Sequence, residues 1–278
     1  MDVTFAHAAG SRHHHDEDWI ATSPEAVVLL DGLSTPEGLQ TGCRHGTPWY
    51  VRRLGTQLLG LLATHPDATL REALACVIQT VAHRHADTCD LSHPGMPSAT
   101  VALLRAGPSD VQCLVLSDAL IVLDTSEGIE VLTDPTVTQL AAEQRRAVLR
   151  ERIGTPGHTL AKQAMVVEQQ RHRNVGGGHW VAAADPDAAT HAVTRTVARH
   201  TIRRAAVLSD GAAVLVDYGL ADWSDILDTL QHAGPAELIA RIRTAEAGDP
   251  LGQRWPRYKI GDDATAALCL FPPHRPTS

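Results

Sequence analysis

Aspartates directly follow three predicted apolar strands, and this placement constrains the fold more than any other feature of the sequence. Asp31 ends the run VVLLD, Asp118 ends CLVLSD and Asp210 ends AAVLSD. An ionised carboxylate at the end of a core strand is costly unless a positive charge neutralises it. Neither Asp31 nor Asp118 has a lysine or arginine beside it in the sequence. A fold that buries these strands is therefore expected to bring cations to their ends.

Two further acidic clusters precede apolar segments. The triplet 16–18 precedes Trp19, and the pair 262–263 precedes the apolar run 264–271. Carboxylates that a fold brings together repel one another, which favours protonation or bound cations. Hard divalent ions such as Mg²⁺ and Mn²⁺ prefer carboxylate, carbonyl and water oxygens. A turn or a helix N-cap explains any single Asp, but the five positions together favour a metal centre.

The hydrophobic pattern predicts strands and helices in one α+β domain. Strands are predicted at 2–8, 26–30, 98–107, 111–118, 120–124, 129–132, 203–211 and 264–271, the four between 98 and 132 forming an antiparallel meander. Helices are predicted twice after residue 31, then from 134 to near 154, and at 211–217, 222–232 and 235–247. Thr69 and Glu72 form a capping box at the start of the second helix. Residues 154–180 are predicted to be an irregular surface excursion. Strands at both chain ends predict a sheet that needs the C-terminus.

Composition excludes several classes of protein. The 278 residues carry 24 basic and 32 acidic side chains, a net charge of −8, which argues against nucleic acid as the main partner. The longest apolar runs fall far short of the roughly 20 residues that cross a membrane, and the N-terminus lacks the features of a signal peptide. Five scattered cysteines without a CxxC pair favour reduced thiols in the cytoplasm.

The acidic positions and their neighbours resemble the metal-dependent type 2C Ser/Thr phosphatases, the PPM family, of bacterial type. The motifs of that family read ED or QD, DG, SG-T-A, GDS, SDG and DN-x-T, in that order. The chain has, in the same order, Glu17-Asp18, Asp31-Gly32, Ser98-Ala99-Thr100, Ser117-Asp118, Ser209-Asp210-Gly211 and Asp262-Asp263-Ala264-Thr265. Each motif alone is weak, but six in order at strand ends are together specific.

The resemblance implies a four-layer α-β-β-α sandwich, in which helix pairs flank two antiparallel sheets and a binuclear metal centre lies at one edge. It implies a single phosphatase domain over residues 1–278, with a core at about 3–271 and a candidate flap at about 150–180. Arginines between 145 and 173 fit such a mobile flap and fit a solvated helix face equally well.

The resemblance also assigns roles in binding Mg²⁺ or Mn²⁺. Asp31 would bridge two ions and the Gly32 carbonyl would hold one of them. Asp210 and Asp262 would complete one of the two sites.

Three further assignments follow from the same motifs. Glu17 or Asp18 would serve the other ion, partly through water. Asp118, at the GDS position, would bind a third, weaker ion found in bacterial members. Arg12 is the candidate for gripping phosphate, although it lies six residues before Asp18, where the family usually has five.

Two such ions can share a water and lower its pKa, and the resulting hydroxide attacks phosphorus in line. No serine or cysteine nucleophile is needed, and the sequence contains neither GxSxG nor a Cys-x₅-Arg phosphatase loop. The predicted function is hydrolysis of phosphate monoesters, with phosphoserine or phosphothreonine on proteins as the leading substrate.

Two alternatives remain. The stretch 33–35 (Leu-Ser-Thr) departs from the residues that usually follow DG, as Ala119 and Asp263 depart from their motifs, so a small phosphorylated metabolite is the second candidate substrate. The other alternative is a pseudophosphatase that only binds phosphoproteins. Retention of Asp31, Asp210 and Asp262 speaks against it. Neither nucleic acid nor a membrane is expected as a partner.

Overall fold

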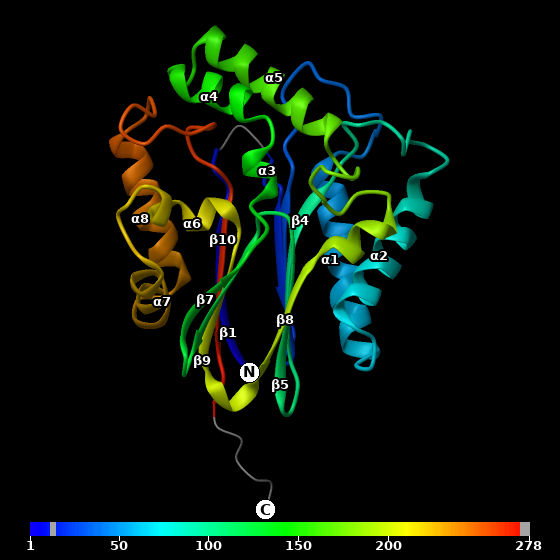
Figure 1. Ribbon diagram of the computed structural model, residues 1–278, viewed down its shortest axis with the longest axis vertical. Coiled ribbons are helices and arrows are strands. Elements are labelled where there is room, and N and C mark those ends of the chain that lie inside the picture. Colours follow the sequence, from blue (N-terminus) through cyan, green and yellow to red (C-terminus); the bar gives the residue numbers. More distant parts are fainter. Residues whose placement is uncertain (12–14, 273–278) are drawn as a thin grey trace, which may run out of the picture.

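Two antiparallel five-stranded sheets face each other in the computed structural model, which describes residues 1–11 and 15–272 (Figure 1). In spatial order, the first sheet contains β1 (Asp2–Ala8), β10 (Ala264–Leu270), β9 (Ile202–Leu208), β6 (Leu120–Thr125) and β7 (Gly128–Leu132). The second contains β2 (Asp18–Thr22), β3 (Ala26–Gly32), β4 (Ala99–Ala106), β5 (Asp110–Leu116) and β8 (Val193–Ala198). The first and last strands of the chain, β1 and β10, pair in the first sheet.

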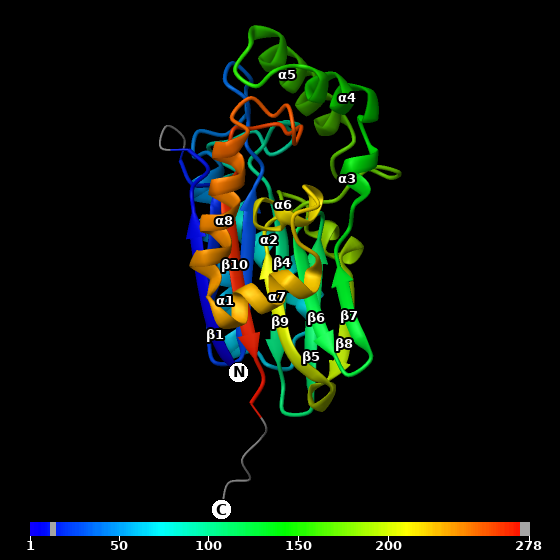
Figure 2. The same cartoon turned by 90° about the vertical axis from the view of Figure 1, so that its left-hand side faces the viewer.

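Helices cover the outer face of each sheet, which confirms the predicted four-layer sandwich (Figures 1 and 2). The second sheet is covered by α1 (Thr47–Thr64) and α2 (Leu70–His85), and the first by α6 (Asp210–Asp217), α7 (Trp223–His232) and α8 (Pro235–Gly248). A third group, above one end of the sandwich, comprises α3 (Thr136–Gln139), α4 (Ala142–Arg150) and α5 (Pro156–Arg171). Short 3₁₀ helices lie at Pro186–His191 and Arg199–Thr201.

Strand β3 shows why the core strands are apolar on both faces. Successive side chains of a strand point to opposite faces. Val27 and Leu29 pack between the two sheets, while Val28 and Leu30 pack against α1 and α2. All four are fully buried. The continuous apolar run before Asp31 is therefore a consequence of the covering helix layer.

The capping box predicted for α2 is present. Thr69 accepts a hydrogen bond from the Glu72 backbone, and the Glu72 side chain accepts one from the Thr69 backbone. Because the helix starts at this fixed point, its apolar residues fall on one buried face, as predicted: Leu70, Leu74, Val77, Ile78 and Val81.

The predicted meander between 98 and 132 is wrong, although its four strands exist. β4 and β5 pair in the second sheet, whereas β6 and β7 belong to the first. The chain changes sheets at Ser117, whose φ of 68° lies in the left-handed region. Strand β9 also ends earlier than predicted, so Asp210 lies in the first turn of α6.

The predicted irregular excursion at 154–180 is also wrong, because most of it is the helix α5. Thr155 accepts a hydrogen bond from the His158 backbone at 3.2 Å, and Pro156 follows at the first helical position. This pair is an ordinary helix-start signal. Strands β2 and β8 were not predicted either.

Within the part of the chain that the structure describes, no helix has both the length and the apolar character needed to cross a membrane.

Close packing of α1 on β2 yields a stability test. A Cβ added at Gly55 would lie 2.1 Å from a ring carbon of Trp19, so Gly55→Ala should lower the free energy of unfolding by about 1–3 kcal/mol through overpacking. No atom of the described residues lies within 4 Å of a Cβ added at Gly60 in the same helix. Gly60→Ala should therefore raise it by about 0.5–1 kcal/mol. Urea unfolding checks both, and equal effects would contradict the close contact.

Candidate metal centre

Carboxylates from both sheets gather at the end of the sandwich below α5. Asp18 of β2 pairs directly with Asp31 of β3, so their side chains leave the same face of the sheet. Asp31 lies within hydrogen-bonding reach of Asp210 at the start of α6. Asp262, just before β10, acts electrostatically on both Asp31 and Asp210. The structure thus brings together acids that lie far apart in the sequence.

These groups cannot all be ionised comfortably without cations. Loss of surrounding water, followed by the charges of Asp18, Asp210 and Asp262, raises the pKa of Asp31 well above its usual value. Loss of water and the charge of Asp262 likewise raise the pKa of Asp210. The cluster remains open to solvent, because Asp210 is exposed and Asp31 and Asp262 are half-buried. Ions and a substrate can therefore reach it.

Glu17 and Asp18 have different surroundings. Asp18 is buried, and its Oδ2 accepts a hydrogen bond from Thr265 Oγ1 at 2.5 Å. Its Oδ1 is buried without a hydrogen-bond partner among the described residues. Glu17 is half-buried and accepts a hydrogen bond from Ser34 Oγ. Burial is the first cause of a raised pKa in both carboxyls.

Asp263 holds the first acidic motif in position. One of its carboxylate oxygens accepts a hydrogen bond from the Gly10 backbone and the other from the Glu17 backbone, each at 2.8 Å. Two N–H donors need two acceptors, which a carboxylate provides. This explains how Asp serves at a motif position where Asn is usual.

Asp118 comes immediately after the left-handed Ser117, and Asp210 and Asp262 act on it electrostatically. Burial and the charge of Asp210 raise the pKa of Asp118 to about 7. A serine in this backbone region is strained and persists only where the surroundings fix it. The family motif has glycine at this position, the residue that adopts such a conformation without strain.

Two glycines of the motifs are required by close approach. A Cβ at Gly32 would lie 2.4 Å from a methyl carbon of Thr47 and 2.7 Å from the Glu17 carbonyl oxygen. A Cβ at Gly211 would lie 2.0 Å from the Asp263 carbonyl oxygen. The DG and SDG motifs thus allow neighbouring segments to approach within the centre.

Two lysines that the motifs did not indicate lie close to the acids. Lys259 forms an ion pair with Asp262 and donates a hydrogen bond to Ser34 Oγ at 3.2 Å. Burial opposes its charge, but Asp262 and the other nearby aspartates raise the pKa of Lys259. Lys162 of α5 is close enough for Lys259, Asp262 and Glu17 to influence its pKa, which burial lowers. These are the only two lysines in the sequence, and their rarity is the one sequence feature that sets them apart as candidates for the site.

The donor set fits hard divalent cations. Five carboxylates influence one another here, those of Asp18, Asp31, Asp118, Asp210 and Asp262, and Glu17 lies beside them under the influence of Asp263. The ammonium groups of Lys259 and Lys162 do not balance this number of acids. The unpartnered Asp18 Oδ1 is a further oxygen without a compensating donor within the described ranges. Oxygen ligands of this kind suit Mg²⁺ and Mn²⁺. Arg12, the candidate for gripping phosphate, lies outside the described residues.

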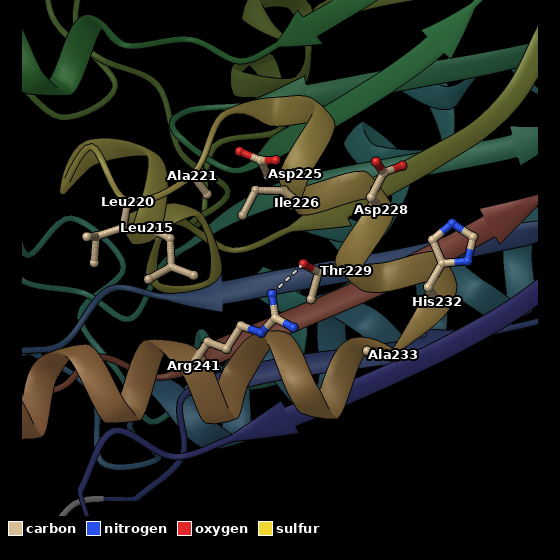
Figure 3. A pocket seen from close by; sticks show the side chains of 10 residues that line it. All are labelled: Leu215, Leu220, Ala221, Asp225, Ile226, Asp228, Thr229, His232, Ala233 and Arg241. Atoms are coloured by element: carbon tan, nitrogen blue, oxygen red, sulfur yellow. Dashed lines mark hydrogen bonds between the residues drawn. The ribbon is translucent and has the colours of Figure 1, made fainter.

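A pocket of about 450 Å³ lies elsewhere, between α6, α7 and α8 (Figure 3). It contains none of the clustered acids. Its most prominent cation, Arg241, already bonds Glu237 and Thr229. We therefore place the candidate functional site at the carboxylate cluster and not in this pocket.

No protein-family model matches the sequence, and no curated protein matches it. Solved structures do resemble it in fold. A bacterial serine phosphatase aligns with a TM-score of 0.59 at 13% identity, covering 99% of both chains. Stp1 from Staphylococcus aureus, a serine/threonine phosphatase, aligns at 0.57 and 12% identity, covering 97% of this chain and 94% of its own. The catalytic domain of the serine/threonine phosphatase PstP, in complex with two manganese ions, aligns at 0.53 and 13% identity, covering 96% of both. The chain therefore has the fold of the PPM-family phosphatases, as its motifs predicted.

The raised carboxyl pKa values predict how pH affects the metal-free protein. Asp118 binds its proton more tightly when folded (pKa about 7) than at its ordinary value of 3.8. The folded state therefore holds more protons between about pH 4 and 7, and the free energy of unfolding should fall as pH rises through that window, by up to about 1.4 kcal/mol per pH unit for each proton.

Denaturant unfolding in EDTA at several pH values measures this slope. Asp118→Asn should flatten it, while Asp67→Asn, in the exposed turn after α1, should leave it unchanged. The same slope in wild type and Asp118→Asn would contradict the assignment.

Proposed function

We propose that this chain is a metal-dependent phosphatase that hydrolyses phosphate monoesters, with phosphoserine or phosphothreonine on proteins as its substrate. The main support for the proposal is that three acids lie close together at a position open to solvent: Asp31, Asp210 and Asp262. The fold, which resembles bacterial Ser/Thr phosphatases, supports it.

We assign the metal-binding roles as the motifs predict. Asp31 would be shared by two ions, Gly32 would offer its carbonyl, Asp210 and Asp262 would complete one site, and Glu17 would serve the other. We assign Asp18 to positioning the neighbouring carboxylates, because one of the Asp18 oxygens already accepts a hydrogen bond from Thr265. Bound Mg²⁺ or Mn²⁺ would supply Lewis-acid activation of water and would neutralise charge on the phosphoryl group.

The lysines give the centre positive charge besides that of the ions. Lys259 comes from the segment before β10 and Lys162 from helix α5. An ammonium is a flexible point charge that suits phosphate oxygens. We propose that Lys162 meets the substrate phosphate from above, which gives the predicted flap at 150–180 a role at the site.

One observation favours a second candidate, binding of phosphoproteins without hydrolysis. The Lys259 ammonium already pairs with Asp262, so it could replace part of the cationic charge that ions would supply. A phosphate-release screen with Mn²⁺ over phosphopeptides and phosphorylated metabolites separates the candidates. Release from peptides supports the leading proposal, release only from metabolites supports the small-molecule alternative, and Mn²⁺ binding with no release supports the binding module.

Asp31→Asn should reduce hydrolysis of a generic aryl phosphate by several orders of magnitude, beyond the 10–100-fold typical of residues that only support metal ligands. The change removes a charge shared by both proposed ion sites. The fold should survive, because losing one of several clustered carboxylates relieves repulsion. Circular dichroism checks the fold, and Asp67→Asn is the matched control. Equal residual rates in wild type and Asp31→Asn would trace the activity to a contaminant.

Asp118→Ala tests the peripheral site. Because the motif assigns Asp118 to a third, weaker ion, the variant should turn over substrate more slowly while it keeps the two tighter ions. Titration calorimetry with Mn²⁺ measures this. Loss of both high-affinity ions would show that Asp118 belongs to the main pair.

A further inference from the structure

A second group of metal-ligating side chains lies outside the carboxylate cluster, where α1 begins and α2 ends (Figure 1). Cys43 and His45 lie in the loop before α1, His85 is the last residue of α2, and Cys89 follows in the next turn. One potential ligand atom from each of the four residues lies within 4.8 Å of all the others.

Three of the distances between the ligand atoms match a single tetrahedral ion. Cys43 Sγ lies 3.6 Å from both His45 Nδ1 and His85 Nδ1, and Cys89 Sγ lies 3.3 Å from His45 Nδ1. Zinc–sulfur bonds of about 2.3 Å and zinc–nitrogen bonds of about 2.0–2.1 Å place tetrahedral ligand atoms roughly 3.3–3.8 Å apart. The two sulfurs, 3.1 Å apart, would need to separate by roughly 0.7 Å to take up tetrahedral positions on zinc.

A disulfide does not account for this arrangement. Cys43 and Cys89 are free thiols, and a covalent bond would bring their sulfurs to about 2.05 Å. A disulfide also needs no histidines, yet both rings turn Nδ1 toward the thiols. Two thiols and two imidazoles are a softer ligand set than the carboxylates of the other centre, and such a set selects zinc.

The surrounding structure holds the four residues in place. His85 is 1% exposed, and Trp49 stacks on His45 with ring centroids 4.3 Å apart. The Asp90 backbone donates a hydrogen bond to the Gly42 carbonyl at 2.9 Å, which joins the loop to the segment after α2. Gly42 has a φ of +66°, and a Cβ there would lie 2.4 Å from His93.

We propose that Cys43, His45, His85 and Cys89 bind one structural Zn²⁺. Four protein ligands leave no open position for a substrate, so the ion is structural. It fastens the loop that leaves the carboxylate cluster after Gly32 to the end of α2. Ser34, which contacts Glu17 and Lys259, lies in that loop. The zinc site does not depend on whether the carboxylate cluster hydrolyses phosphate.

Metal analysis of the full chain, purified under reducing conditions without chelators, tests the proposal. Wild type should carry one zinc per chain, and Cys43→Ser and Cys89→Ser should lose it. Cys76→Ser is the matched control, because Cys76 is exposed on the same helix α2 but outside the cluster. Asp31→Asn should also keep its zinc, which separates this site from the proposed catalytic one.

Cobalt substitution keeps the test decisive if a cysteine variant fails to fold. Reduced wild type loaded with Co²⁺ should show the visible bands of tetrahedral cobalt and a thiolate charge-transfer band. Removing zinc with a strong chelator should lower its melting temperature by several degrees, and added Zn²⁺ should restore it.

Three results would overturn the proposal. The first is reduced wild type that carries no zinc and takes up neither Zn²⁺ nor Co²⁺. The second is full zinc content in Cys43→Ser and Cys89→Ser. The third is bound iron with visible absorption, which would replace the single ion with an iron–sulfur group.

Discussion

Repulsion among carboxylates at one end of the sandwich is the constraint on which the rest of the site depends. Asp18 and Asp31 leave neighbouring strands side by side, and Asp210 and Asp262 approach from the opposite sheet. Such an arrangement is stable only with bound protons, ammonium groups or metal ions. The structure uses Lys259 for part of this charge. Loss of surrounding water and, after it, the excess of acid raise the carboxyl pKa values, and the same excess of acid gives the cluster its capacity for divalent ions.

The sandwich brings acidic motifs that are distant in the sequence to the same end of the fold. The first and last strands, β1 and β10, pair in one sheet, and Asp263 accepts hydrogen bonds from the backbones of Gly10 and Glu17. The first and last acidic motifs are therefore fixed to each other, although they lie at opposite ends of the sequence. The loop that follows Gly32 would be fixed a second time, at the proposed zinc site. Two metal chemistries, one with oxygen ligands and one with sulfur and nitrogen, would then stabilise one end of the fold.

Much of the fold was predictable because its signals are local. The apolar run before Asp31, the capping box at Thr69 and the proline and glycine boundaries of the helices depend on near neighbours. The helix α5 was missed although Thr155 and Pro156 mark its start. The single meander failed because a turn at Ser117 sends successive strands to different sheets, and pairing is decided by partners far along the chain.

The sequence by itself determined which carboxylates the centre has, because each follows or precedes an apolar segment that must be buried. The tertiary structure alone decided that Thr265 holds Asp18 and that Lys259 pairs with Asp262. It alone brought the Cys43 and His45 pair to the His85 and Cys89 pair. A short spacing such as Cys-x-His or His-x₃-Cys provides half of a site, and only the packing of α1 against α2 brings two halves together. Contacts of this kind depend on distances across the fold, which no local periodicity encodes.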